Sequence, residues 1–525
     1  MLGKSAEARG AELLPIAAIF AVAALGMLAV FSSCSFLFLL QEWVDDNLFL
    51  TIGRAIMRGE VLYVDAFDHK GLYLYLLYGV AAELNGLFPV QNPFFVVYLF
   101  EAAAATVYML YLYRIARLYL EDVRLCGGIA LLSGFLTYQS DAMYTGGSVE
   151  EFVLPLVVYG LYHGLLLARR GALQEIGTFF RSGMLAGLVL WSKFTLLGFW
   201  IGWCAYFGVL TWKRSGFAAA LSRMLAVLCG MALVSVPVFV YFALNGALGA
   251  MFRSYFYFNL VLYPSSHTLA ERFAGWAGIL CGMANGLAPS YVLAALLLLA
   301  GGCYAGMRGS GASVFAFAGS MWFFVYVGGV TLFYYYLPFY AFSALGLVAA
   351  AKLVFFVWER LPRRVPRMQR CVRFSASVAA FLCLIGGAAC GAAYAFDKGF
   401  VREYRLYYAP YSLAERMEGK NPTLLCYYDY DRGLYALTDT LPFNKYYCLV
   451  NVPYEKFPEL YEEQKSLVAA GIPDYVTVCE FNLPDAQARA LLEERYEFVT
   501  SARTLRGEVV QLWQRKAEET PRKAN

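Results

Sequence analysis

The 525-residue sequence has little charge and few histidines. Asp, Glu, Lys and Arg make up 15% of it, and histidine occurs 3 times. Because a soluble domain carries about a quarter charged residues, most of this chain is not suited to water. The 12 cysteines include no Cys-x-x-Cys pair, and most of them lie in apolar runs. This usage gives no support to a zinc-finger or redox protein, and nothing in the composition indicates a nucleic-acid partner.

Hydrophobic residues, by contrast, make up 60% of the sequence, with 41 Phe and 40 Tyr. Apolar runs of roughly 20 residues, enough to cross a hydrocarbon core of about 30 Å, recur over residues 1–396. The first run, 13 to 40, is too long for a signal-peptide core and is predicted to be a retained span. The sequence therefore predicts an all-α polytopic membrane domain with about 11 to 13 transmembrane helices.

Basic clusters separate the apolar runs, the last of them at 359 to 373. The positive-inside rule assigns these clusters, and with them the N-terminus, to the cytoplasm. Residues 41–71 then form a first outer loop and residues 138–150 a second outer loop. A span at 374 to 396 brings residues 397–525 to the same outer side.

Two segments are too short to supply the full transmembrane spans that this orientation requires. Only about 31 residues separate Arg181 from Lys213, which predicts a shallow hairpin with its apex at 191 to 195. Arg9 and Arg114 are both assigned to the cytoplasm, so an even number of spans must separate them, but three apolar runs lie between them. We expect the run 72 to 90 to lie in the membrane interface or to re-enter. A cytoplasmic loop at 85 to 94 would also fit the sequence.

The tail, 397–525, has a different composition and predicts a small extracytoplasmic α/β domain. Its apolar runs at 423 to 429, 446 to 451 and 474 to 480 are typical of strands, and the polar stretch 454 to 471 is typical of a helix. Residues 496–516 predict two further strands about a turn.

The first outer loop gathers the first candidate functional residues. Asp45 and Asp46 precede an amphipathic helix that we expect to lie on the membrane surface. Beside lipid such carboxylates are candidate bases or cation ligands, although helix capping is an equally ordinary role. Lys70 and His69 follow, and could bind an anionic headgroup. Snorkelling of Lys70 to the interface is the alternative.

A second set lies further along the chain. Glu150 and Glu151 stand at the mouth of a span, where charge is expensive and often functional. Lys193 lies at the apex of the short hairpin, where a lipid phosphate would be a suitable partner. Tyr335 and Tyr336 are candidate substrate contacts, although an aromatic belt explains them equally well.

The order of these parts resembles the GT-C membrane glycosyltransferases, and most of all the group of protein O-mannosyltransferases and aminoarabinose transferases, often classed as glycosyltransferase family 39. The resemblance covers most of residues 40–345 through four short motifs. They are Asp45-Asp46 with Phe49 and Arg54, Lys70-Gly71-Leu72-Tyr73, Trp191-Ser192-Lys193-Phe194, and Tyr335-Tyr336-Leu337-Pro338. Asp46 replaces the usual glutamate, Gly71-Leu72 replace two prolines, and Phe194 replaces a glycine.

The resemblance implies transfer of a sugar from a polyprenyl-phosphate carrier to a hydroxyl of a glycan, lipid or protein, with inversion, in a bacterial plasma membrane. It implies Asp45 as base with Asp46 beside it, and Lys70, Lys193 and Arg54 on the donor phosphate. Glu150 or Glu151 would complete the acidic site. A divalent metal on Asp45, Asp46 and Glu150 stays open, as do a lipid-linked glycan flippase or transporter and an oligosaccharide ligase or polymerase.

Overall fold

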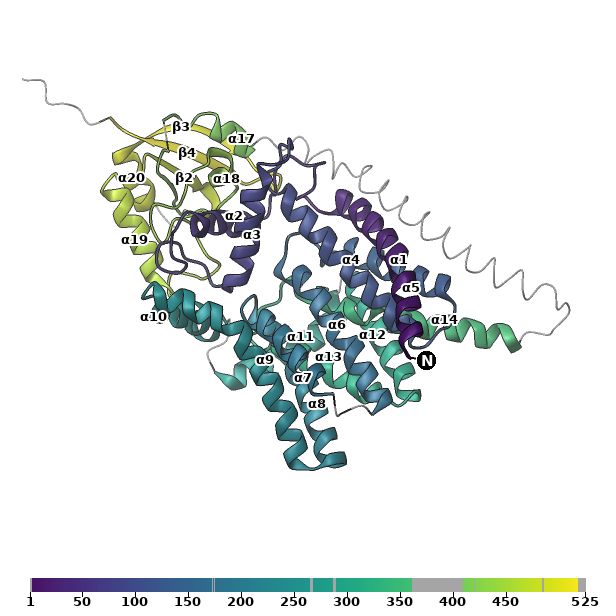
Figure 1. The fold of residues 1–525 in the computed structure, drawn as a ribbon. Helices are drawn as coiled ribbons and strands as arrows, with labels where there is room; N and C mark the ends of the chain where they lie inside the picture. Colours follow the sequence, from purple (N-terminus) through teal and green to yellow (C-terminus); the bar gives the residue numbers. More distant parts are fainter. Residues whose placement is uncertain are drawn as a thin grey trace, which may run out of the picture. The chain divides into compact units, whose positions relative to one another are not determined.

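The computed structural model describes residues 2–171, 173, 175–264, 268–286, 289–360, 409–419, 421–483 and 486–517. The predicted span at 374 to 396 and nearly all of the basic cluster before it lie outside these residues. The chain divides into two compact units (Figure 1). Unit 1 contains residues 1–35, 97–238 and 265–399, and unit 2 contains residues 36–96, 239–264 and 400–525.

Unit 1 is helical. Its helices are α1 (Leu2–Phe31), α4 (Phe95–Arg117), α5 (Val123–Tyr138), α6 (Val149–Arg170), α7 (Ile176–Leu190), η1 (Phe194–Leu197), α8 (Gly198–Ser215), α9 (Phe217–Leu244), α11 (Leu269–Gly286), α12 (Pro289–Met307), α13 (Gly311–Tyr326), η3 (Phe333–Phe342) and α14 (Ser343–Arg360). Within the described residues, seven helical segments are long and apolar enough to cross a membrane, and three shorter apolar helices accompany them. The predicted polytopic helical architecture is confirmed.

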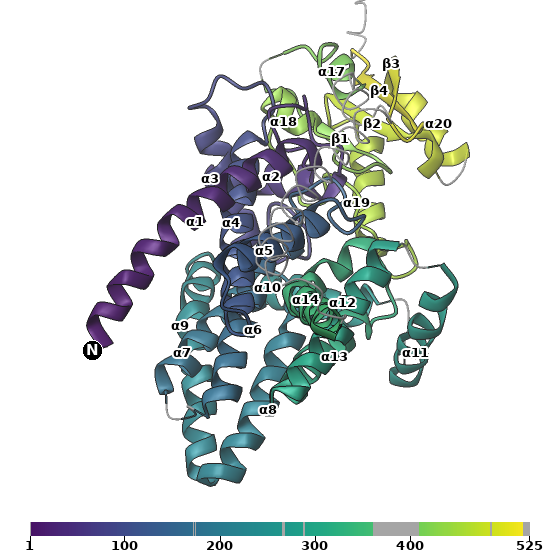
Figure 2. The ribbon, with the colours of Figure 1, turned by 90° about the vertical axis from the view of Figure 1, so that its right-hand side faces the viewer.

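The short hairpin of unit 1 has the apex that the sequence predicts. α7 ends at Leu190, residues 191–193 leave the helix, and the chain continues through η1 into α8. The helices α7, α8 and α9 lie side by side in both views (Figures 1 and 2). Glycine permits the closest of these approaches, because a Cβ on Gly183 would stand 2.0 Å from the carbonyl oxygen of Val227. Small residues at such crossings are typical of helices packed in membranes.

Unit 2 begins with two packed helices, α2 (Val44–Met57) and α3 (Leu72–Asn85). They meet at Gly53 and Gly79, where a Cβ on Gly53 would lie 2.5 Å from the Gly79 nitrogen. α3 has 14 residues, and a helix of that length spans only about 21 Å. That the segment after Lys70 does not cross the membrane stays a prediction.

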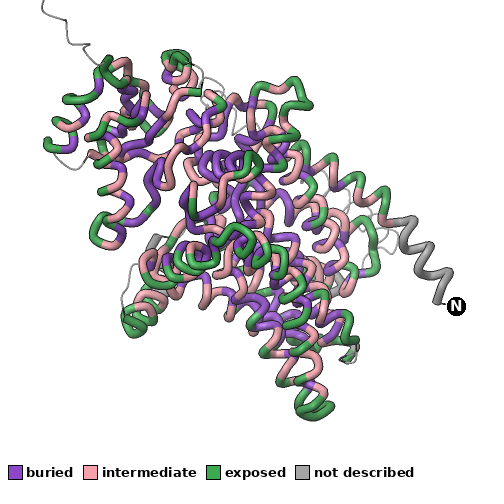
Figure 3. The backbone as a smooth tube through the Cα atoms, turned by 60° about the vertical axis from the view of Figure 1, so that its left-hand side comes forward, coloured by how far each residue is buried: buried purple, intermediate pink, exposed green. Residues whose placement is uncertain are grey.

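The polar face of α2 is buried, and the expected position of the helix on the membrane surface stays a prediction. Its residues from Asp46 to Ala55 are all buried, including the polar Asn47, Thr51 and Arg54. These polar side chains face the C-terminal part of unit 2, which covers the side of the helix that the sequence pattern leaves to solvent. Buried residues run through the interior of both units (Figure 3).

The rest of unit 2 comprises α10 (Leu248–Met251), the π-helix η2 (Phe252–Leu262), and the tail. The tail contains α17 (Ala409–Ala414), β1 (Leu424–Cys426), α18 (Leu434–Thr438), α19 (Pro458–Ala469), β2 (Tyr475–Cys479), η4 (Glu480–Asn482), α20 (Ala486–Arg495), β3 (Tyr496–Arg503) and β4 (Val509–Arg515).

The four strands form one sheet in the order β1-β2-β4-β3. β1 and β2 are parallel, and β4 pairs antiparallel with both β2 and β3. Leu425, Val476, Leu492 and Trp513 belong to its core together with Val468 of α19. The strand expected at 446 to 451 is wrong. Residues 446–450 are buried, but the run makes only isolated backbone bonds, such as Cys426 N–H to the Tyr447 carbonyl at 2.8 Å.

Candidate functional site

The two adjacent aspartates of unit 2 lie in the first turn of α2 and have different environments. The N-cap residue is Trp43, without a side-chain cap. Asp46 is fully buried and accepts a hydrogen bond of 2.8 Å from the Gln41 side chain. Asp45 is only half-buried. Both lie at the positive end of the helix dipole, and Asp45 is the more accessible of the two.

Phe49 connects this end of α2 to Lys70. Phe49 follows Asp45 by four residues, so the two share a stripe of the helix. Its buried ring packs edge to face on Tyr75 and Tyr78 of α3, with centroids 6.0 and 5.5 Å away. The Lys70 ammonium lies 5.8 Å from the Phe49 centroid. Lys70 therefore stands beside the stripe of α2 that begins at Asp45.

Arg54, the other donor-phosphate candidate of this unit, contacts the tail. The guanidinium of Arg54 donates to the Tyr435 carbonyl at 2.8 Å and forms an ion pair with Asp439. Thr51, one turn earlier, donates to Asp431 at 2.6 Å. Burial raises the pKa of the Asp431 carboxyl to about 6, against the opposing effects of the Thr51 hydrogen bond and the Arg54 charge. This face of α2 thus holds the tail.

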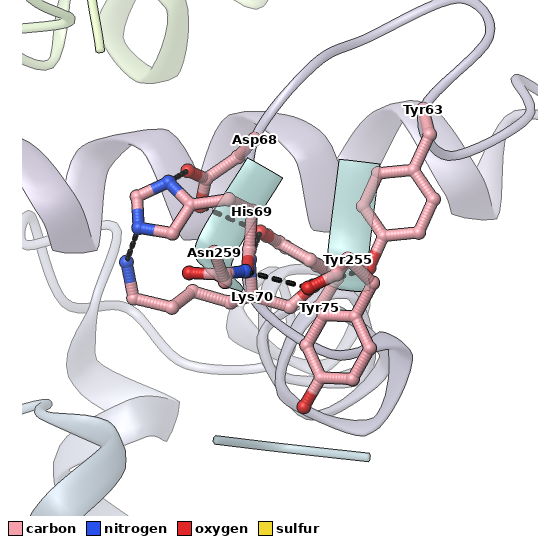
Figure 4. A network of polar contacts seen from close by, with 7 residues as sticks. All are labelled: Tyr63, Asp68, His69, Lys70, Tyr75, Tyr255 and Asn259. Atoms are coloured by element: carbon pink, nitrogen blue, oxygen red, sulfur yellow. Dashed lines mark hydrogen bonds and ion pairs between the residues drawn. The ribbon is translucent and has the colours of Figure 1, made fainter. Parts of the chain in front are cut away.

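A polar network lies around the backbone of Lys70 (Figure 4). The Asp68 carboxylate lies 3.0 Å from Nδ1 of His69 and accepts a 2.6 Å hydrogen bond from the Tyr75 hydroxyl. His69 Nε2 lies 3.0 Å from the Lys70 ammonium. Burial would raise the pKa of Asp68, but the charge of Lys70 and the contact with His69 outweigh it and hold that pKa below its ordinary value.

In unit 1 the ammonium of Lys193 forms an ion pair with Glu150. The side chains are 11% and 2% exposed, so this pair is largely removed from water. The same ammonium lies 4.0 Å from the Tyr335 ring centroid and 5.3 Å from that of Tyr334. A carboxylate and two aromatic faces thus offset the buried charge at the hairpin apex.

Tyr336, the neighbour of Tyr335, has other partners. Its hydroxyl lies 2.7 Å from the Ser290 hydroxyl, which donates to Asp141 of the second outer loop at 2.8 Å. The Tyr335 ring thus contacts Lys193, whereas the Tyr336 hydroxyl contacts Ser290.

Glu101, a fully buried carboxylate within α4, is not among the residues that the sequence patterns indicate. It accepts hydrogen bonds from the Ser32 hydroxyl at 2.7 Å and the Gly147 N–H at 2.5 Å. Glu151 accepts from the same N–H at 3.1 Å. Gly146 has φ +85°, and a Cβ there would lie 2.5 Å from Glu101 Oε1. A lone glutamate inside an apolar run was the available signal, because such charges are expensive in a membrane.

A divalent metal on Asp45, Asp46 and Glu150 would need these side chains to gather as ligands. In the part of the chain that the structure describes, no three His, Cys, Asp or Glu side chains gather at metal-binding distance. Asp46 accepts from Gln41, and Glu150 is paired with Lys193. We therefore derive no step through a metal.

This helical fold with a small C-terminal sheet is of the GT-C type. No protein-family model and no curated protein matches the chain, but solved structures do. They include ArnT, an aminoarabinose transferase, from Cupriavidus metallidurans. The undecaprenyl phosphate complex is 15% identical, covers 94% of this chain and 97% of its own, and superimposes with a TM-score of 0.54. The apo form is 14% identical, covers 96% of this chain and 98% of its own, and superimposes with a TM-score of 0.53. The predicted GT-C fold is confirmed.

Proposed function

We propose that this protein is an integral membrane glycosyltransferase that moves a sugar from a polyprenyl-phosphate carrier to a hydroxyl acceptor. Support for the class comes from the GT-C fold, shared with ArnT over nearly the whole length of both chains. Support for the carrier comes from the undecaprenyl phosphate bound to that ArnT structure. The acceptor is a hydroxyl of a glycan, a lipid or a protein.

The observation that carries the proposal is the arrangement of Asp45, Phe49 and Lys70. A half-buried carboxylate at the start of α2 and an ammonium beside the next turn of that helix provide a base and a cation within one unit. Transfer from a phosphate carrier requires these two groups. Phosphate is already a competent leaving group, so its glycosidic oxygen needs no strong general acid.

The reaction follows from these roles. Asp45 accepts the proton of the acceptor hydroxyl while that oxygen attacks the anomeric carbon. The bond from this carbon to the phosphate oxygen breaks, and its electron pair leaves with the phosphate. Lys70 stabilises the departing charge as a point cation. One displacement inverts the anomeric carbon.

In unit 1 we assign a phosphate-binding role to Lys193. Glu150 and the Tyr335 ring hold its ammonium in place. Glu151, with Glu101, holds the glycine turn at 146 to 147 and so shapes the second outer loop. We assign Arg54 to the support of α2, because its guanidinium already binds Tyr435 and Asp439.

For the location we propose a bacterial plasma membrane, with the N-terminus in the cytoplasm and the tail, residues 397–525, outside. The basic clusters between the apolar runs support this orientation. Cysteine-accessibility labelling of residues in the second outer loop and in the tail should place both on the outer face. Labelling of the tail from the inside contradicts the orientation.

The function is tested with the full chain in lipid nanodiscs, given a polyprenyl-phosphate sugar and candidate hydroxyl acceptors. Wild type should release free polyprenyl phosphate, and Lys70→Met should release it at least about 10-fold more slowly, because a charge-assisted contact is lost. A matched variant, Lys352→Met, removes a half-buried lysine of α14 in the other unit and should not change release. Movement of the lipid-linked sugar across a membrane without release of the carrier would identify a flippase and overturn the proposal.

A further inference from the structure

Lys70 is held on three sides by residues outside the family-like motifs. Its backbone N–H donates to the Tyr75 hydroxyl at 3.1 Å, and its carbonyl accepts from the Tyr63 hydroxyl. Its ammonium lies 3.0 Å from His69 Nε2. Both ends of a long flexible side chain are thus fixed (Figure 4).

The hydrogen-bonding capacities of the groups determine the state of His69. The ionised Asp68 carboxylate only accepts, so the His69 nitrogen 3.0 Å from it, Nδ1, carries a proton. The Lys70 ammonium only donates, so Nε2 at 3.0 Å must accept. His69 is therefore a neutral imidazole with its proton on Nδ1. In histidines generally, a carboxylate at one ring nitrogen fixes the tautomer and leaves the other nitrogen as an acceptor.

The imidazole is also fixed by the π-helix η2. His69 is 7% exposed and stacks on Phe258, with centroids 5.2 Å apart and an interplanar angle of 27°. The Tyr263 ring lies 4.8 Å from it on centroids. Asn259 donates to the His69 carbonyl at 2.6 Å. The ring has little freedom to turn its Nε2 away from Lys70.

We propose that His69, oriented by Asp68, is a positioning residue that holds the Lys70 ammonium for the donor phosphate. This inference rests on the proposed function and adds a role that it does not contain. One N–H of the ammonium donates to Nε2, and this bond fixes the direction in which the ammonium points. A lysine held this way loses less side-chain freedom when the carrier binds.

The arrangement gives the site a pH dependence. When the imidazole takes a proton, Nε2 becomes a donor and no longer accepts from Lys70. The His69 imidazolium and the Lys70 ammonium then repel each other. The other titratable groups around this network are Tyr63 of the loop, Tyr75 of α3, Tyr255 of η2, Tyr263 directly after η2, and Tyr447 and Cys448 of the tail. Tyrosine and cysteine ordinarily stay neutral below pH 7, so loss of affinity on the acid side is assigned to His69.

Binding of undecaprenyl phosphate to the full chain in nanodiscs tests this role without relying on turnover. His69→Phe keeps a ring but removes the acceptor, and should weaken binding by about 10-fold. His69→Gln can place an amide oxygen near the Nε2 position and should recover most of that affinity. Between pH 8 and pH 5.5 wild type should lose affinity more steeply than His69→Gln, which has no proton to gain. Titration of the phosphate itself is common to both proteins.

The outcomes separate the two proposals. If wild type binds and Lys70→Met weakens binding, but His69→Phe equals wild type, the positioning role is overturned and the proposed function stands. If His69→Gln binds as weakly as His69→Phe, or follows the wild-type pH profile, His69 serves only to pack. If wild type shows no affinity for the phosphate lipid, the proposed function fails and this inference fails with it.

Discussion

The hydroxyl of Thr51 donates a 2.6 Å hydrogen bond to the carboxylate of Asp431, which lies 380 residues further along the chain. Both residues are buried within unit 2. The helix that begins with the proposed base is therefore held by the tail. Three predictions follow from this relationship and from the ion pairs around the site.

The first prediction concerns the pH dependence of this contact. The folded pKa of Asp431 is about 6, raised by burial, whereas an unfolded aspartate titrates near about 3.9. A raised pKa stabilises the fold fully below about pH 4, and that contribution is lost as pH rises through about 6. Exchange of amide hydrogens in α2 and β1 should therefore be slower at pH 5 than at pH 7, after correction for intrinsic rates.

Asp431→Asn should flatten this dependence, because the amide cannot ionise. The matched variant Glu497→Gln changes an exposed carboxylate of β3 and should keep the wild-type profile. Faster corrected exchange at pH 5 than at pH 7 in wild type contradicts the buried state of Asp431.

The second prediction separates two roles of Arg54. Arg54→Lys keeps the charge but loses the planar fork that reaches both the Tyr435 carbonyl and Asp439. It should lower the free energy of unfolding of unit 2 by about 1–3 kcal/mol and leave the affinity for undecaprenyl phosphate nearly unchanged. Asp439→Asn should cost less than about 1 kcal/mol, because that carboxylate is 77% exposed. If Arg54→Lys binds undecaprenyl phosphate more weakly and its stability is unaltered, Arg54 contacts the phosphate and does not act as a support of α2.

The third prediction concerns the buried pair in unit 1. Glu150→Leu leaves the Lys193 ammonium without its carboxylate in a site that is largely closed to water, and should cost about 3–5 kcal/mol. Lys193→Met should be costly for the same reason. The double variant should be more stable than the sum of the two losses indicates, and should remain unable to bind the carrier tightly. Additive losses in thermal unfolding would show that the two side chains are not coupled.

Sequence patterns predict those features of this fold that depend on local composition. The apolar runs, the break at 191 to 193, and the strands at 424 to 426 and 475 to 479 all follow from hydrophobicity and charge spacing. The spacing of the basic clusters also predicts that one of the first three apolar runs does not cross the membrane. The candidate residues Asp45, Lys70, Glu150 and Lys193 also stand out as charges beside apolar sequence.

Features that depend on distant partners could not be predicted in this way. The polar face of α2 looks solvent-exposed until Asp431 and Tyr435, hundreds of residues away, cover it. Residues 446–451 form an apolar run typical of a strand, but they lie beside β1 with only isolated backbone bonds. The role of Asp68 depends on Tyr75, one turn into a helix whose packing the sequence does not specify.

The central claim is that Asp45 is the base, and the adjacent aspartate provides the control. Asp45→Asn should lower the rate of sugar transfer in a single turnover by about 10²–10⁴-fold, because general-base catalysis contributes that much, with undecaprenyl phosphate binding unchanged. Asp46→Asn alters a buried carboxylate that accepts from Gln41, and should reduce stability more than the transfer rate. The account is contradicted if Asp45→Asn transfers the sugar at the wild-type rate, or if Asp46→Asn rather than Asp45→Asn shows the large loss of transfer rate.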